Sequence, residues 1–89
     1  MTDGRFSVSP DTAVTLGDRL RQERVRLNMS QQDFGSIGGV KTDAQYKYER
    51  SLRIPKADYL AEIAKVGVDI LYVITGNTAP TVSNDSMKN

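Results

Sequence analysis

Apolar residues recur at helical spacing in short blocks that glycine, proline and small polar residues separate, and this pattern predicts an all-α chain. The first block opens with Thr15 and Asp18, which have the spacing of a helix N-cap and its acidic partner. One face of the next two turns is then marked by four residues: Leu16, Leu20, Arg24 and Leu27. We therefore expect a first helix from about residue 16 to 27.

A second cap follows at once, because Ser30 and Asp33 repeat the same spacing. It predicts a short second helix from Gln31 to about Ile37, with Phe34 on its inner side. The segment 38–40, Gly-Gly-Val, then supplies a glycine for a helix end and an apolar anchor.

A third helix is expected from Lys41 or Thr42 to about Arg50. Its buried side is indicated by three residues at a spacing of four: Val40, Ala44 and Tyr48. Thr42 and Gln45 also have capping spacing, which would shift the helix start. Residues 51–55 are expected to form a loop, because Pro55 disfavours helix at the preceding residue.

The fourth helix is expected from residue 56 or 57 to Lys65, with Leu60, Ile63 and Ala64 inward. Gly67 ends it, and Asp69 can cap a last helix that Gly76 ends. Residues 70–74 of that helix are apolar on every side, so they need a second partner surface besides the core.

Outside this region the helical pattern is absent. Residues 1–14 are expected to form a flexible N-terminal arm and residues 77–89 a disordered C-terminal tail. The expected architecture is thus one compact five-helix bundle over residues 15–76 of an 89-residue chain.

Composition narrows the possible functions. The chain has no cysteine and no histidine, which argues against thiolate or imidazole catalysis, disulfides and most zinc sites. We expect neither an enzyme nor a metal or cofactor. No apolar run approaches the ~20 residues of a membrane span, and no signal peptide is evident, so a cytoplasmic location is expected.

The net charge of +1 conceals an uneven distribution. Residues 15–56 contain nine Lys and Arg against five Asp and Glu, which is +4, whereas residues 1–14 carry −1 and residues 57–89 carry −2. The positive middle fits either a surface that faces a polyanion or ordinary scatter of solvated charge.

Two short helices joined by a glycine turn, between Ser30 and Arg50, have the arrangement of a DNA-reading helix-turn-helix. The sequence also resembles the phage repressor and Cro-like helix-turn-helix family over about residues 16–76. The motifs that carry the resemblance are Ser-Gln-Gln-Asp-Phe at 30–34, Gly-Val at 39–40, Tyr-Glu-Arg at 48–50, Pro55, Leu-Ala-Glu-Ile-Ala at 60–64 and the ending at 69–76.

The resemblance implies a lambda-repressor-like fold and a transcriptional regulator, usually a repressor, that binds a palindromic operator as a dimer. By position, Gln31 matches a phosphate-contacting residue at a helix N-terminus. On the third helix, the resemblance places five residues at base edges or flanking phosphates: Lys41, Thr42, Asp43, Tyr46 and Lys47. Tyr46 either stacks on the DNA backbone or folds back over the core.

Two further groups of residues accompany the motif. Arg24 lies on the inner face of the first helix, and Glu49 matches an acid of the family, so a bidentate ion pair between them is expected to brace the recognition helix. In the following loop, Arg50, Arg53 and Lys56 either contact phosphates or serve solubility.

Three positions depart from the family pattern. Gly35 and Gly38 stand where larger residues are usual, which costs about 1 kcal/mol each relative to alanine, and Ile37 is expected to cover the gap at Gly38. Gln45 stands where the family buries Ile or Val. It either forms internal hydrogen bonds or lies on a shifted helix, where its amide would read adenine.

Two functions remain open. The first is a homodimeric DNA-binding regulator that dimerises through Ile70, Val73 and Ile74 and reads half-sites ~10 base pairs apart. The alternative is a protein-interaction module on the same fold, such as an antirepressor or antitoxin-like protein. The glycines, Gln45 and the modest charge favour this alternative slightly.

Overall fold

The computed structural model describes residues 15–78, and these form five helices in the order the sequence predicts. The helices are α1 (Leu16–Arg26), α2 (Gln31–Gly38), α3 (Thr42–Glu49), α4 (Ala57–Ala64) and α5 (Ile70–Thr75). The expected N-terminal arm, and the expected tail after residue 78, lie outside the described residues.

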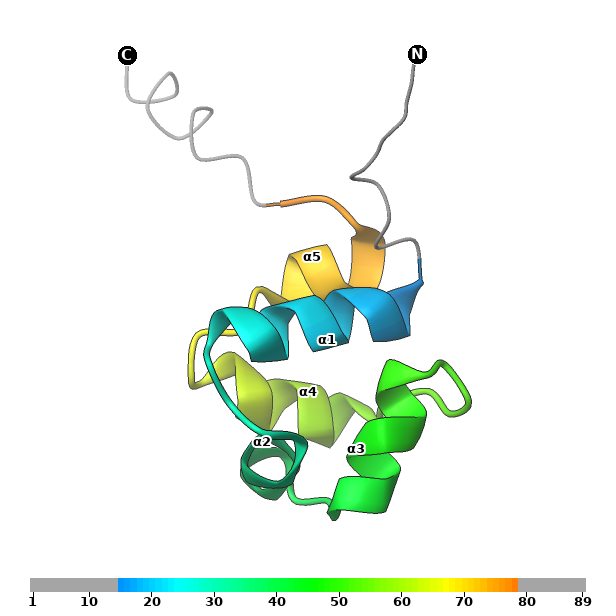
Figure 1. Cartoon of the computed structure of the whole chain (residues 1–89). Coiled ribbons are helices and arrows are strands. Elements are labelled where there is room, and N and C mark those ends of the chain that lie inside the picture. The colour runs from blue at the N-terminus through cyan, green and yellow to red at the C-terminus, as the bar shows by residue number, and fades with distance from the viewer. Residues whose placement is uncertain (1–14, 79–89) are drawn as a thin grey trace, which may run out of the picture.

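Helix α1 is the centre of the arrangement, with α5 on one side and α3 and α4 on the other (Figure 1). Helix α2 packs against both α3 and α4, and α1 packs against α3 and α5. Residues from all five helices and the α4–α5 turn form one buried apolar cluster: Leu20, Phe34, Tyr48, Tyr59, Ile63, Val68 and Val73. The all-α bundle is therefore confirmed.

The predicted caps are present. Thr15 forms a complete capping box with Asp18, and the side chains of Ser30 and Asp69 accept hydrogen bonds from the third residues of α2 and α5. Gly39 ends α2 in the left-handed region, with φ of 83°. Such local chemistry satisfies the free N–H and C=O groups of the short helices, which explains why their ends follow the sequence closely.

The start of α3 settles one alternative. Thr42 is the first helical residue, and Lys41 takes the N-cap position without a side-chain hydrogen bond. Thr42 is therefore not the cap, and the shifted helix that a Thr42 cap would produce does not form.

The inner face of α4 differs from the prediction. Ile63 is buried and Leu60 packs against the core, but Ala64 is exposed. Tyr59 is buried instead, because its ring packs edge-on against Tyr48 with the ring centroids 4.8 Å apart. The buried side of α4 is thus rotated toward α2 and α3.

The gap at Gly38 is filled by Tyr59 and not by Ile37, so that expectation was wrong. A Cβ atom at Gly38 would lie 2.2 Å from Cδ1 of the Tyr59 ring. Ile37 is half-buried and packs at the edge of the core. The glycine on α2 therefore provides the space that the aromatic ring on α4 occupies.

Helix α1 approaches the end of α3 closely at Gly17. A Cβ atom there would lie 2.5 Å from the backbone oxygen of Glu49, and the Gly17 N–H donates to Oγ of Ser51. This contact sets the distance between α1 and α3.

Over residues 15–78, no helix is both long and apolar enough to cross a membrane.

Candidate nucleic-acid interface

The outer face of α3 is polar and open to solvent. Lys41, Thr42, Asp43 and Tyr46 are exposed, and Lys47 is half-exposed. These five of the residues predicted to contact DNA therefore lie on the surface, whereas Gln45, described below, does not. The five surface residues provide two ammonium groups, a carboxylate and two hydroxyls within two helical turns, which can bind base edges or phosphates.

Tyr46 does not fold back over the core. Its ring is exposed, and the guanidinium of Arg50 lies over it, with Cζ 5.7 Å from the ring centroid. A cation above an aromatic ring is attracted by the ring's negative face. The contact therefore holds the positive charge of Arg50 against the Tyr46 ring near the end of α3.

The N-terminus of α2 lies beside the same face. Gln31 is half-buried, and its Nε2 donates to Oε1 of Glu49 over 3.2 Å. A shallow hollow lies between the two helices of the motif, lined by Gln32, Ser36, Val40, Lys41 and Thr42. The α2 N-terminus, with its free N–H groups, is thus close to α3.

The predicted Arg24–Glu49 ion pair is present and bidentate. Nε and Nη2 of Arg24 lie 2.6 and 3.0 Å from the two carboxylate oxygens of Glu49, and Nη1 donates to the backbone oxygen of Met29. Burial raises the pKa of Glu49, but hydrogen bonds from Arg24, Gln45 and Gln31 outweigh it, and the net pKa lies below its ordinary value. The charged pair ties α3 to α1.

Gln45 is the main correction among the predicted DNA-contacting residues. Its side chain is 0% exposed, so it does not lie on the outer face of α3. Its Nε2 donates to Glu49 over 2.7 Å, and its Oε1 accepts from the Tyr59 hydroxyl over 2.5 Å. Of the two alternatives for this residue, internal hydrogen bonding is the one observed, because Tyr59 supplies a partner that local sequence could not reveal.

The loop after α3 carries the three predicted basic residues in exposed positions, which are Arg50, Arg53 and Lys56. Between them, Leu52 and Ile54 are 69% and 81% exposed. The loop is held by backbone hydrogen bonds from Ser51 and Leu52 to α3. It therefore presents basic and apolar side chains together, in a fixed position beside the outer face of α3.

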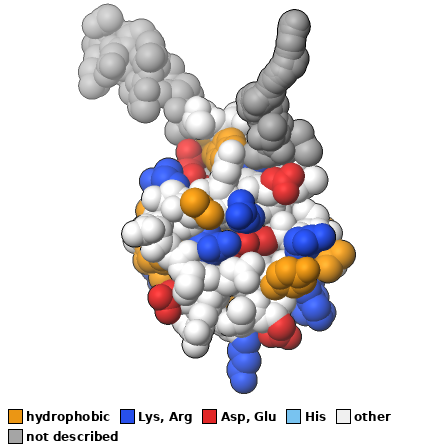
Figure 2. Space-filling model, viewed as in Figure 1, with side chains coloured by type: hydrophobic (Ala, Val, Ile, Leu, Met, Phe, Trp, Pro, Cys, Tyr) orange, Lys and Arg blue, Asp and Glu red, His pale blue; other side chains and the backbone are white. Residues whose placement is uncertain are grey.

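Charge on the face shown in Figure 2 is mixed. Lysine and arginine side chains are separated there by neutral residues and by carboxylates, and on this described face no continuous basic patch forms.

The predicted dimer surface is corrected in part. Val73 is 0% exposed and belongs to the core, and Ile70 is half-buried against it, because α5 packs on α1. Ile74 does lie on the surface, as does Leu71, with 47% and 44% of their areas exposed. The apolar outer side of α5 thus consists of Leu71 and Ile74.

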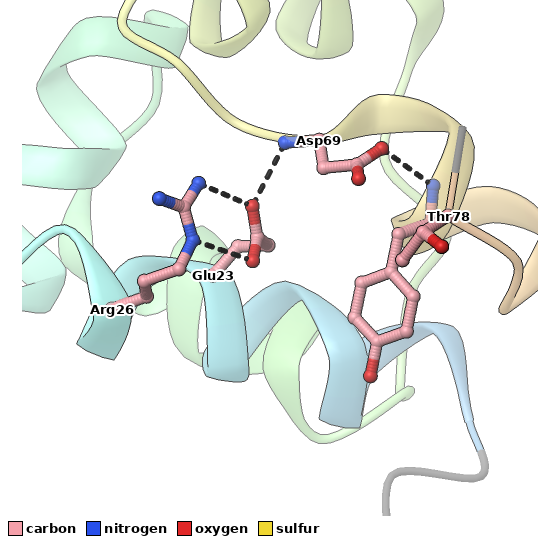
Figure 3. Close-up of a pocket in the computed structure, with 5 residues that line it drawn as sticks. Glu23, Arg26, Asp69 and Thr78 are labelled. Carbon is pink, nitrogen blue, oxygen red and sulfur yellow. Dashed lines mark hydrogen bonds and ion pairs between the residues drawn. The ribbon is translucent and has the colours of Figure 1, made fainter. Parts of the chain in front are cut away.

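A second ion pair, between the buried carboxylate of Glu23 and the exposed side chain of Arg26, was not predicted from the sequence. Glu23 pairs with Arg26 over 2.8 Å and accepts a hydrogen bond from the backbone N–H of Asp69 (Figure 3). The hydrogen bond from Arg26, supported by that of Asp69, keeps the pKa of Glu23 below its ordinary value. The spacing of three between Glu23 and Arg26 was a local signal, but the contact with Asp69 joins distant segments.

Comparisons with known proteins agree with this geometry. No family model matches the chain. Two curated relatives, uncharacterized HTH-type transcriptional regulators from two strains of Mycobacterium tuberculosis, are each 34% identical over 68 residues. The match covers 73% of this chain and 49% of each relative, so the chain spans about half the length of the curated relatives it matches.

Among solved structures, the DNA-binding domain of the P22 C2 repressor superposes with a TM-score of 0.65. The match covers 79% of this chain and 93% of that domain, at 27% sequence identity. The chain is therefore similar to HTH-type transcriptional regulators and shares the fold of a phage repressor's DNA-binding domain.

Proposed function

We propose that this protein is a DNA-binding transcriptional regulator that places α3 in the major groove of an operator. The observation that carries the proposal is the exposed polar face of α3, which lies beside the α2 N-terminus in the helix-turn-helix arrangement. The names of its relatives and the P22 C2 repressor domain support it. Repression of a palindromic operator is the expected mode.

The residues divide into two roles. Gln31 at the α2 N-terminus, with Arg50 and Arg53 after α3, is proposed to contact phosphates and orient the domain. Thr42, Asp43 and Lys47 are proposed to read bases. Thr42 would contact a thymine methyl or donate a hydrogen bond, Asp43 would accept from a cytosine amino group, and Lys47 would donate to guanine. Lys41 and Tyr46 complete the surface at its two ends.

A homodimer would give the affinity and symmetry that a palindromic site needs. We propose that the exposed side of α5, Leu71 and Ile74, forms the contact between two copies. The two α3 helices would then read half-sites ~10 base pairs apart. Leu71→Glu with Ile74→Glu should give a monomer in analytical ultracentrifugation, whereas Leu52→Glu, on the loop, should not. Dimers that persist in the α5 variant would reject this surface.

Titration against random duplex DNA at two salt concentrations tests the function directly. Binding should weaken steeply with salt, because each phosphate contact releases counterions. Sequences selected from a random pool should then contain an inverted repeat. Lys47→Ala should relax the preference at one base pair of each half-site, whereas Lys65→Ala, at the C-cap of α4, should leave the selected sequence unchanged.

The alternative function is a protein-interaction module on this fold. The exposed Leu52 and Ile54 favour it, because large apolar side chains held at the surface are common in protein interfaces. An absence of salt-sensitive binding to duplex DNA would reject the regulator and leave this alternative.

A further inference from the structure

A chain of hydrogen bonds beneath α3 connects four helices. The Tyr59 hydroxyl on α4 donates to Gln45 on α3, and Gln45 donates to Glu49 one turn further on. Glu49 in turn accepts from Gln31 on α2 and Arg24 on α1. Gln45 and Glu49 are buried, so these bonds form where water cannot replace them.

Both the oxygen and the nitrogen of the Gln45 amide form hydrogen bonds, and the strength of each bond depends on its direction. Burial raises the pKa of Tyr59, so its hydroxyl stays protonated and acts as the donor to Oε1. The amide nitrogen donates to Glu49. A buried Ile or Val at this position would fill similar space but would allow α3 to rotate or slide with little penalty, since apolar contacts are not directional.

The neighbouring glycines on α2 make this polar pair possible. The Tyr59 ring occupies the position of a Gly38 side chain, since a Cβ there would lie 2.2 Å from the ring. At Gly35, a Cβ would lie 3.4 Å from Cβ of Gln45 and 3.1 Å from the backbone oxygen of Val40. The three departures from the family pattern, at Gly35, Gly38 and Gln45, thus form one arrangement together with the Tyr59 ring.

The outer face of α3 is coupled to this arrangement by geometry. Asp43 and Lys47 stand two residues before and after Gln45, about 200° around the helix, so they project from the opposite side. A side-chain tip ~6 Å from the helix axis moves about 1 Å when the helix turns by about 10°. Hydrogen bonds to base edges tolerate little more than that.

We infer that Gln45 and Tyr59 are positioning residues that orient the recognition helix without touching DNA. They determine which bases the outer residues of α3 reach, and so act on specificity through Asp43 and Lys47. This inference rests on the proposed DNA-binding function for its consequence. The inference goes beyond that function, because it assigns part of the protein's preference among DNA sequences to a buried pair of residues.

The test compares Tyr59→Phe with Val68→Ala in the full chain. Tyr59→Phe removes only the hydroxyl that holds Gln45, whereas Val68→Ala opens the core at the α4–α5 turn, away from α3 and from Leu71 and Ile74 on α5 (Figure 1). Each is measured at a temperature where unfolding curves show it folded. The readouts are the affinity for the selected operator, the affinity for random duplex DNA, and the amide chemical shifts of residues 42–49.

Tyr59→Phe should lower the ratio of operator to random affinity about tenfold, the value of one good base contact, and should shift the α3 amides. Val68→Ala should change neither the ratio nor those shifts. An unchanged ratio in folded Tyr59→Phe, or an equal fall in Val68→Ala, would overturn the inference.

If Tyr59→Phe fails to fold, the double variant Gln45→Leu with Tyr59→Phe replaces both partners by apolar groups and leaves no buried amide unsatisfied. Its ratio should also fall, and a wild-type ratio would overturn the inference. Wild-type protein without salt-sensitive DNA binding would instead reject the proposed function. The α3 amide shifts would then still decide whether the pair positions the helix.

Discussion

The carboxylate of Glu49 receives both arms of the Arg24 guanidinium at 2.6 and 3.0 Å, although the two residues stand 25 positions apart. The Glu49 side chain is 2% exposed and that of Arg24 is 13% exposed. Further hydrogen bonds from Gln31 and Gln45 reach the same carboxylate. The buried carboxylate of Glu49 thus holds the helix-turn-helix to α1.

Glu49→Ala should destabilise the fold strongly. It leaves the Arg24 charge without its partner in a largely buried position, and it removes the acceptor of two glutamine amides. The expected loss in the free energy of unfolding is about 3–5 kcal/mol. Urea unfolding followed by circular dichroism would measure it.

The control for this prediction is Glu62→Ala on α4. Glu62 forms an exposed ion pair with Lys65 over 3.1 Å. Exposed pairs contribute about 0–1 kcal/mol, so this variant should unfold close to the wild type. Equal unfolding free energies for Glu49→Ala and Glu62→Ala would show that the Arg24–Glu49 pair does not brace the fold.

Stability should fall in acid because of the buried carboxylates. Hydrogen bonds from Arg24, Gln45 and Gln31 overcome burial and hold the pKa of Glu49 below its ordinary 4.5, and the hydrogen bond from Arg26 lowers the pKa of Glu23 likewise. As pH falls below about 4.5, the unfolded chain takes up protons that the folded chain still resists. The stabilisation that the two lowered pKa values provide is fully present above about pH 4.5, and it is lost as the pH falls through the pKa values of the folded protein.

Measuring unfolding free energy from pH 7 to pH 3 tests this. Glu49→Gln should be less stable at pH 7 and should lose less stability than the wild type on acidification. Glu62→Gln, at an exposed site, should keep the wild-type acid dependence. A Glu49→Gln curve that runs parallel to the wild type would contradict the assignment.

Gly38→Ala should destabilise the protein even though alanine favours helix by about 1 kcal/mol over glycine. The added Cβ would overlap the buried Tyr59 ring, which is held between Tyr48 and Gln45. Overpacking of this kind costs about 1–3 kcal/mol. Thermal unfolding would measure the loss.

Two further variants separate the steric cause from a backbone one. Gly38→Ala should cost less in a Tyr59→Leu background than in the wild type, because the ring that the added Cβ would overlap is gone. Gly39→Ala should also destabilise, but through the left-handed φ of 83°, since no atom lies within 4 Å of its added Cβ. A gain in stability for Gly38→Ala would mean that Tyr59 moves aside freely.

Arg53→Ala tests the proposed phosphate contacts of the loop after α3. It should weaken binding to operator and random DNA by the same factor and reduce the slope of log affinity against log salt by about one. Lys65→Ala removes one positive charge elsewhere and should leave the slope nearly unchanged. An unaltered slope in Arg53→Ala would assign that residue to solubility alone.

Local sequence determined the helices of this protein and their ends. The caps at Thr15, Ser30 and Asp69 and the turn at Gly39 act within a few residues of themselves, so they could be predicted without the fold. The Arg24–Glu49 pair could also be predicted, but only through the resemblance, which supplied the contact between distant helices.

Tertiary packing decided which faces of those helices are buried. Gln45 could be an internal or a DNA-reading residue until α4 placed the Tyr59 hydroxyl against it. Similarly, Val73 entered the core because α5 packs on α1, which left Leu71 and Ile74 outside. The physical reason is the same in both cases. The environment of a side chain depends on the residues that folding brings next to it. The periodicity within one helix carries no information about which residues of other helices those are.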